Sequence, residues 1–246
     1  MAVADPSGCA VVELRQYTLH PGQRDVLIDL FDREFVESQD AVGMTVMGQF
    51  RDLERDDRFV WLRGFPGMEQ RASSLAAFYG GPVWAAHRDD ANATMIDFDD
   101  VLLLRPARSG AGLAIDIGDR PGRAAGTPAA AVFAVDIHPI ARDAAEARVS
   151  VFFEKAVPIL EATGAEPAGV YVSEPGPNTF PALPVRETDT VLVWVARFAD
   201  QAAFDDHAAR LSAHPGWAAV AADLGEGGRG EPLRLILSPT ARSAMR

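Results

Sequence analysis

Alternating apolar and polar residues mark the beginning of the chain as a β-strand. In VVELRQYTL (residues 11–19) the alternation and the β-branched residues are those of a strand. In the next segment, residues 20–38, a proline lies near the start and Leu27, Phe31 and Phe35 fall on one stripe at four-residue spacing. This is the pattern of an amphipathic helix, so the chain begins with a strand followed by a helix.

The same patterns continue through the first hundred residues. GMTVMGQF (43–50) and DRFVWLRGF (57–65) are predicted strands, separated by a charged hairpin loop. A helical region covers residues 66–95 and is broken at GGP (80–82), and DDVLLLR (99–105) is a fourth strand. The order βαββαβ is that of a ferredoxin-like unit, an antiparallel sheet with both helices on one face.

The pattern occurs twice in the chain. FVWLRGF (59–65) aligns with LVWVARF (192–198), and LLLRP (102–106) aligns with LILSP (235–239), both at an offset of 133 residues. Three segments at one offset are typical of an internal duplication, and the third is the pair of tryptophans, Trp84 and Trp217, which we expect to pin a broken helix to its sheet.

Upstream, the offset is smaller. LHP (19–21) matches IHP (137–139) at an offset of 118, and Gly43 matches Gly164 at 121. The difference comes from SEPGPNTFPALPVRETD (173–189), whose four prolines predict a surface insertion in the second copy. Pro158 falls inside the first helix of that copy and is expected to kink it.

Two such sheets can close face to face and so remove their bare faces. We therefore predict an α+β fold in which two tandem ferredoxin-like (βαββαβ) repeats close into one α+β barrel. The predicted parts are a mobile N-terminal tail (1–10), the first repeat (11–106), a Gly/Pro linker in which LAIDI could add an edge strand (107–129), a degenerate second repeat (130–239) and a C-terminal tail (240–246).

The opening VVELRQYTLHPGQ, together with GFPGMEQRASSLAAFYGGPVWAAHR, resembles the NIPSNAP family, a branch of the dimeric α+β barrel superfamily. The resemblance covers residues 11–106 and weakens from residue 130 onward, where the opening motif is lost. It implies the barrel fold but no single activity, because barrel relatives include cofactor-free monooxygenases, isomerases, haem-handling enzymes and binding modules.

One face of the predicted sheet gathers polar side chains. Glu13, Arg15 and Tyr17 alternate along the first strand and therefore share a face. The neighbouring third strand places Trp61 and Arg63 on the same surface. Gln49 of the second strand is expected to join them. The alternative is that Glu13 and its arginines form only a structural ion pair, which at a surface contributes roughly 0–1 kcal/mol.

The second copy serves as an internal comparison. At an offset of 118 the positions of Glu13, Arg15 and Tyr17 hold apolar residues, Phe133 among them, and Trp194 takes the place of Trp61. We therefore expect a site inside the closed barrel, with polar groups from the first repeat and an apolar wall from the second, the usual composition of a small-molecule pocket. The predicted catalytic residues are Glu13, Arg15, Tyr17, Arg63 and His87; the predicted substrate-binding residues are Gln49, Trp61, Trp84, Phe133 and Trp194.

Composition excludes several function classes. The net charge of −12 is unfavourable for binding nucleic acid, and no apolar run is long enough for a membrane helix. The only cysteine, Cys9, falls in the predicted tail, and one lysine, Lys155, stands against 22 arginines. Disulfides, P-loop chemistry and most Schiff-base mechanisms are therefore not expected, and the histidine spacing predicts no metal site.

Three functions remain open. The first is an enzyme that acts on a small organic molecule without a bound cofactor, as an isomerase, cyclase or monooxygenase, with arginines holding a carboxylate or enolate oxygen. The second is a non-enzymatic module that binds a small ligand or acts as a scaffold. The third is haem binding through His87 or His20. In each case we expect a cytoplasmic monomer or homodimer.

Overall fold

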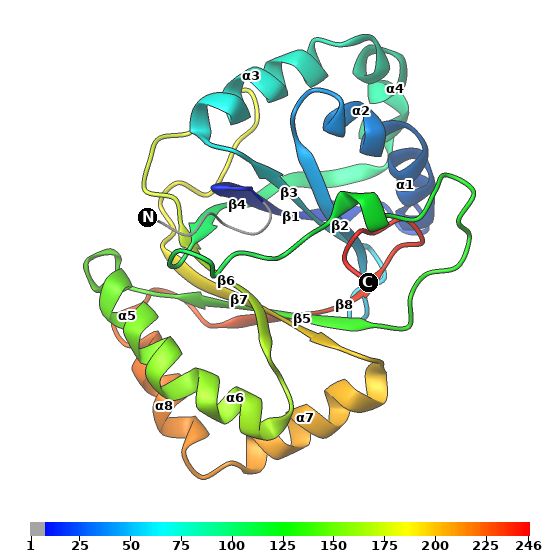
Figure 1. The fold of residues 1–246 in the computed structure, drawn as a ribbon. Coiled ribbons are helices and arrows are strands. Elements are labelled where there is room, and N and C mark those ends of the chain that lie inside the picture. Colours follow the sequence, from blue (N-terminus) through cyan, green and yellow to red (C-terminus); the bar gives the residue numbers. More distant parts are fainter. Residues whose placement is uncertain (1–7) are drawn as a thin grey trace.

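The computed structural model describes residues 8–246, and their strands close into one eight-stranded barrel with helices on two opposite sides (Figure 1). The predicted fold class, two ferredoxin-like repeats closed into an α+β barrel, is confirmed. None of the helices in residues 8–246 is both long enough and apolar enough to cross a membrane.

Each repeat supplies four strands and four α-helices in the predicted order. The first repeat contains β1 (Val11–Leu19), α1 (Arg24–Leu30), α2 (Val36–Asp40), β2 (Thr45–Asp52), β3 (Arg58–Phe65), α3 (Met68–Tyr79), α4 (Pro82–Ala93) and β4 (Met95–Pro106). The second contains β5 (Val132–Pro139), α5 (Ala145–Val151), α6 (Val157–Thr163), β6 (Pro167–Ser173), β7 (Val191–Phe198), α7 (Gln201–Ala213), α8 (Trp217–Gly225) and β8 (Leu233–Pro239).

The strand order around the barrel is β1-β3-β2-β8-β5-β7-β6-β4, which brings β4 back to β1. Every pairing is antiparallel. Two short seams join the repeats, β2 with β8 and β4 with β6. Closure therefore leaves neither repeat with a free sheet edge at these strands.

The inside of the barrel is a packed apolar core. On β1 the even-numbered Val12 and Leu14 face inward, where Phe133 from β5 packs against Phe50 with ring centroids 5.3 Å apart. The odd-numbered side chains face the helices of the first repeat instead. The expected site inside the barrel is thus wrong, because alternate residues of a strand lie on opposite faces and Glu13, Arg15 and Tyr17 are on the outer one.

Strand register corrects the offset used to compare the two copies. Arg15 pairs with Trp61, and Asp136 pairs with Trp194. Because the tryptophans are equivalent, Arg15 corresponds to Asp136, at an offset of 121 rather than 118. The error of three residues is odd, so it exchanged the two faces of the strand and placed Phe133 on the wrong side.

A π-helical turn interrupts the first helix of each repeat, at Phe31–Phe35 and at Phe152–Ala156. The two turns are again 121 residues apart. Pro158 lies in the first turn of α6, directly after the second interruption. Since the first repeat has the same turn without a proline, Pro158 is accommodated by the irregularity and does not cause it.

Segments outside the two repeats place side chains inside the barrel. Residues 1–7 of the predicted N-terminal tail lie outside the described residues, but Cys9 is buried in the barrel core. Leu113 of the linker enters the same core without forming a strand, and its N–H donates to the Tyr171 hydroxyl at 2.7 Å. Met245, from the expected C-terminal tail, is also buried there. These side chains fill space that a ligand would need.

Candidate functional site

The polar residues of β1 and β3 meet at one buried carboxylate on the outer face of the first repeat's sheet. Glu13 Oε2 accepts from Arg15 Nη1 at 2.7 Å and from Arg63 Nε at 2.8 Å, and Oε1 accepts from Arg71 Nε at 2.7 Å. All four side chains are at most 1% exposed. Three guanidinium groups around one carboxylate give this cluster, which we call the Glu13 cluster, a formal net charge of +2.

The arginines of the cluster act on two groups that can lose a proton, the Glu13 carboxyl and the neighbouring Tyr17 hydroxyl. Burial alone would raise the pKa of Glu13, but the three guanidinium groups outweigh it and hold that pKa well below its usual value. Burial raises the pKa of Tyr17 above its usual value, against the opposing effect of Arg15. At neutral pH Glu13 is therefore an anion that anchors the arginines, and Tyr17 keeps its proton.

An aromatic cavity lies beside the cluster, between the sheet and the helices. Tyr17 and Trp61 from the sheet, Gln39 from α2 and Trp84 from α4 contribute to its lining. The other lining residues are apolar or aromatic: Leu27, Phe31, Phe35, Phe78, Tyr79, Ala91 and Met95. Its volume is about 30 Å³, room for one or two water molecules.

The arginines form a second layer behind this lining. Arg15 Nε donates to the Tyr17 hydroxyl at 2.9 Å, and Arg63 Nη1 donates to Gln39 Oε1 at 2.9 Å. The Arg63 guanidinium also lies 5.0 Å from the centre of the Trp61 ring. The positive charge therefore acts on the cavity through Tyr17 and Gln39, and Tyr17 retains a hydroxyl proton that it can donate.

Buried donors in this region outnumber their acceptors. Arg71 Nη2 and Trp61 Nε1 are buried donors without a hydrogen-bond partner among the described residues, against one such acceptor on this face of the sheet, Gln49 Oε1. Arg71 Nη1, by contrast, donates to Asn178 Oδ1 at 2.9 Å and to Thr179 Oγ1 at 3.3 Å. Unsatisfied buried N–H groups are costly, so a surplus of donors beside a net positive charge favours an anionic ligand.

Most of the predicted site residues lie together. Glu13, Arg15 and Arg63 form the cluster, while Tyr17 and Trp61 adjoin it and line the cavity. Gln49 lies on the same face of the sheet, opposite Trp61, but its amide donates to Asp32 at 3.0 Å. Trp84 lines the cavity from α4, with its ring centroid 4.8 Å from that of Tyr79.

Three predicted residues lie apart from the cluster. Phe133 is in the barrel core, and Trp194 packs between sheet and helices of the second repeat. Neither forms the apolar wall expected of it. His87 is in the middle of α4 and does not line the cavity; its Nε2 lies 3.7 Å from a carboxylate oxygen of Glu34. His20 is exposed after β1, and residues 8–246 contain no group of three or more His, Cys, Asp or Glu that could hold a metal.

Sequence reasoning missed Arg71, the third guanidinium group. Its signal was present: Arg71, Leu75 and Phe78 fall on the buried stripe of α3 at spacings of four and three. An arginine at a core position of an amphipathic helix needs a buried partner, and Glu13 is that partner. Asn178 and Thr179 could not be found in this way, because they come from the insertion of the other repeat.

The corresponding face of the second repeat is polar, though differently so. Asp136 Oδ1 accepts from Arg234 Nε at 2.7 Å, and the ring of His138 stacks on Trp194 with centroids 4.5 Å apart. Burial lowers the pKa of His138 to about 4. The expectation that this copy had lost its charged side chains is therefore wrong, because the corrected register replaces apolar residues by Asp136 and His138.

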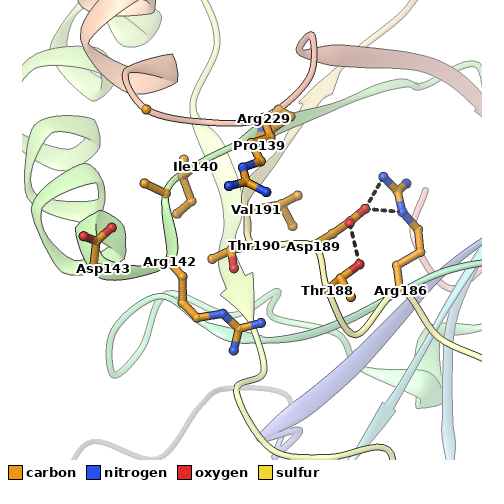
Figure 2. Close-up of a pocket in the computed structure, with 12 residues that line it drawn as sticks. Pro139, Ile140, Arg142, Asp143, Arg186, Thr188, Asp189, Thr190, Val191 and Arg229 are labelled. Atoms are coloured by element: carbon orange, nitrogen blue, oxygen red, sulfur yellow. Dashed lines mark hydrogen bonds and ion pairs between the residues drawn. The ribbon is translucent and has the colours of Figure 1, made fainter.

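A larger cleft, of about 430 Å³, lies at one end of the second repeat (Figure 2). Arg142, Arg186 and Arg229 surround it. Arg186 is already paired with Asp100 and Asp189, and all three arginines are exposed. Exposed guanidinium groups are hydrated, so this cleft lacks the desolvated charge that distinguishes the Glu13 cluster, in spite of its greater volume.

Comparisons with known proteins agree with this architecture. Residues 12–109 match the family model described as NIPSNAP, which confirms the resemblance for the first repeat. A search of curated proteins finds no match.

Solved structures match over nearly the whole chain. An "anthrone oxidase-like protein" is 11% identical, with 96% of this chain and 94% of that chain covered and a TM-score of 0.59. A "putative monooxygenase" from Lactobacillus acidophilus NCFM is 13% identical over 93% of each chain, with a TM-score of 0.55. A second "putative monooxygenase", from Fusobacterium nucleatum subsp. nucleatum ATCC 25586, is 8% identical, with 94% of this chain and 92% of that chain covered and a TM-score of 0.56. At these identities the likeness establishes the two-repeat barrel fold.

Proposed function

We propose that the first repeat binds a small aromatic molecule with an acidic oxygen, a carboxylate or an enolate, in the cavity beside the Glu13 cluster. The observation that carries this proposal is the arrangement of three buried guanidinium groups around one carboxylate, next to a cavity walled by aromatic rings. Walls of aromatic rings favour contact with an aromatic ligand, and a ligand anion would offset the charge of +2.

We further propose that the bound molecule is converted without a bound cofactor. The Tyr17 hydroxyl, which keeps its proton, donates to the ligand oxygen, and the arginines behind it stabilise negative charge there. Stabilising an enolate makes its parent carbon acid easier to deprotonate, and the proton passes to water because the cavity lining, within residues 8–246, holds no carboxylate or histidine. An electron-rich enolate can then react with dioxygen: a CH₂ group becomes C=O, one oxygen atom enters the product and the other leaves as water. The structural neighbours described as an "anthrone oxidase-like protein" and as a "putative monooxygenase" are compatible with this reaction.

A binding function without turnover is the second candidate. It is favoured by the state of Glu13, whose two oxygens are fully engaged by guanidinium groups and whose pKa is held low. Such a carboxylate is a poor proton acceptor, so the cavity contains no evident base. In this case the same ligand would bind and remain unchanged.

The binding proposal is tested by thermal unfolding with 1-naphthoate and with 1-naphthamide, its uncharged analogue. A ligand at 100 times its Kd stabilises the folded state by about 2.7 kcal/mol, and for a chain of this size that raises Tm by roughly 5–11 °C. We expect this shift for 1-naphthoate. Arg71→Gln should bind 1-naphthoate about tenfold or more weakly than the parent chain does and bind 1-naphthamide equally well. Arg33→Gln, at an exposed arginine on the same repeat, is the matched control.

Two outcomes would contradict the anion site: equal stabilisation by 1-naphthoate and 1-naphthamide, or an unchanged affinity of Arg71→Gln for 1-naphthoate. Turnover is measured with anthrone in an oxygen electrode, where the proposed reaction consumes one O₂ for each anthrone oxidised to the quinone. Binding without oxygen uptake would support the non-enzymatic candidate.

A further inference from the structure

The insertion of the second repeat, residues 173–189, lies against the first repeat, next to the side chains that line its cavity. In Figure 1 it is the yellow segment that leaves β6 and runs up beside α3. Its contacts with the first repeat extend along its length: Glu174 N–H donates to the Leu103 carbonyl at 2.8 Å, Thr179 Oγ1 donates to the Met68 carbonyl at 3.1 Å, and Arg186 N–H donates to the Val101 carbonyl at 2.9 Å. The insertion is thus a cover on the first repeat.

Asn178 joins the cover to the Glu13 cluster. Its Oδ1 accepts from Arg71 Nη1 at 2.9 Å and from the Phe180 N–H at 3.0 Å, while its Nδ2 donates to the Leu183 carbonyl at 2.9 Å. One side chain therefore fixes the fold of the insertion and the direction of the Arg71 guanidinium. Because Asn178 is uncharged, it holds Arg71 without neutralising it.

Phe180, Leu183 and Val185 form the apolar part of the cover, and Phe180 is the aromatic residue among them. Its ring stacks on Tyr79, with centroids 6.1 Å apart and planes inclined by 24°. Tyr79 in turn packs edge-on against Trp84 at 4.8 Å, and both Tyr79 and Trp84 line the cavity. Phe180 thus lies one ring away from the cavity, on the side where the insertion passes.

The cavity is too small for an organic ligand unless part of its surroundings moves. At about 30 Å³ it holds one or two waters. The sheet that forms its floor belongs to the closed barrel and is fixed by pairing on both sides. Residues 174–189 of the insertion belong to no strand of the barrel; they are held by hydrogen bonds, by the Arg186–Asp100 ion pair and by apolar packing of Phe180, Leu183 and Val185. Four prolines restrict the internal freedom of the insertion, so it would move as a unit.

We propose that the insertion of the second repeat completes and gates the site of the first, with Asn178 and Thr179 as positioning residues for Arg71 and Phe180 as the gating side chain. This inference rests on the proposed function for the identity of the ligand, but not for the motion. The second repeat therefore contributes to the site through its insertion, and the ligand enters when Phe180 leaves Tyr79.

The motion is tested without a ligand, by ¹⁹F NMR of the full chain labelled with 5-fluorotryptophan. The four tryptophans give two signals from the site, Trp61 and Trp84, and two internal controls from the second repeat, Trp194 and Trp217. The probe is the neutral paramagnetic solute TEMPOL, which broadens signals that it can approach. Signals are assigned by single Trp→Phe substitutions.

We expect Phe180→Ala and Asn178→Ala to increase TEMPOL relaxation of the two site signals at least threefold and to leave the two controls unchanged. Phe180→Tyr keeps the stacked ring and should behave as the parent chain, as should Ala182→Ser at an exposed position of the insertion. Unchanged site signals in both alanine variants, or an equal increase at all four tryptophans, would overturn the proposal.

A second measurement separates the gate from the binding function. In stopped-flow experiments with 1-naphthoate, Phe180→Ala should raise the association and dissociation rates at least tenfold with a smaller change in Kd, because a gate controls passage in both directions. Rates equal to those of Ala182→Ser would contradict gating. If 1-naphthoate does not bind the parent chain at all, the proposed function fails, and the gate is then judged by the NMR result.

Discussion

Replacing Glu13 by Gln removes the single negative charge of the Glu13 cluster while keeping the shape of the side chain. Three guanidinium groups, all at most 1% exposed, would then face a neutral amide. Removing one partner of a buried ion pair costs about 3–5 kcal/mol, because the remaining charge is left desolvated and unpaired. Since three charges lose their partner here, we expect a loss of about 4 kcal/mol in the free energy of unfolding. For a chain of this size that lowers Tm by roughly 8–16 °C.

The pH dependence of the free energy of unfolding tests the role of Glu13 independently. The pKa of Glu13 in the folded protein lies below its ordinary value of 4.5. Its contribution to stability is therefore complete above about pH 4.5 and is lost as the pH falls toward the folded-state pKa, where the unfolded chain binds a proton that the folded chain does not. Glu13→Gln has no such group, so its stability should fall less steeply than that of the parent chain below pH 4.5.

Urea unfolding followed by tryptophan fluorescence, at several pH values between 3 and 7, measures both effects. Glu34→Gln is the control: this carboxylate is 28% exposed and pairs with Arg33 at the surface, where we expect a loss under about 1 kcal/mol. A Glu13→Gln protein within about 1 kcal/mol of the parent, with the same acid limb, would show that the guanidinium groups do not depend on Glu13. The electrostatic argument for an anion site would then fail.

Two further predictions concern the barrel and the second repeat. An added Cβ at Gly64 would overlap Cys9 Sγ and lie 2.7 Å from Cys9 Cβ. Gly64→Ala should therefore lower the free energy of unfolding by about 1–3 kcal/mol. Cys9→Gly in the same chain should recover at least half of this loss in a double-mutant cycle, and strictly additive losses would contradict the contact. Burial lowers the pKa of His138 to about 4, whereas the same side chain in the unfolded chain accepts a proton near pH 6.5. The free energy of unfolding should therefore fall by about 3 kcal/mol as the pH falls from 6.5 to 4. His138→Phe keeps a ring against Trp194 and should remove this pH dependence. If urea unfolding of His138→Phe shows the same loss of stability between pH 7 and 4 as the parent chain, the prediction is refuted.

The fold could be predicted from the sequence because its two signals are redundant. Hydrophobic periodicity gave the βαββαβ order, and the spacing of 133 residues between the two tryptophan-bearing strands showed that the order occurs twice. Both signals survive errors of a few residues. The polar face of β1 was also predictable, since Glu13, Arg15 and Tyr17 share a face in any register.

The location of the site was not predictable in the same way, because it depends on parity. Knowing that Glu13 and Val12 face opposite ways does not tell which of them faces the barrel. The comparison that should have decided this used an offset of 118, and the odd error of three residues turned Phe133, an inward-facing residue, into a neighbour of the site. Cross-strand pairing with Trp61 and Trp194 decides it, and only coordinates supply that pairing.

The contribution of the insertion could not be inferred from periodicity at all. Its prolines marked it as a loop, but nothing in its sequence indicates that it crosses to the other repeat. That placement follows from closure: the seam between β4 and β6 brings the end of β6 next to the first repeat, so a long connection from β6 to β7 passes over α3. A duplicated unit that stayed separate could not use such a loop. Because the two sheets share one barrel, an insertion in the second repeat can cover a cavity in the first, and the two copies can diverge into a site and its cover.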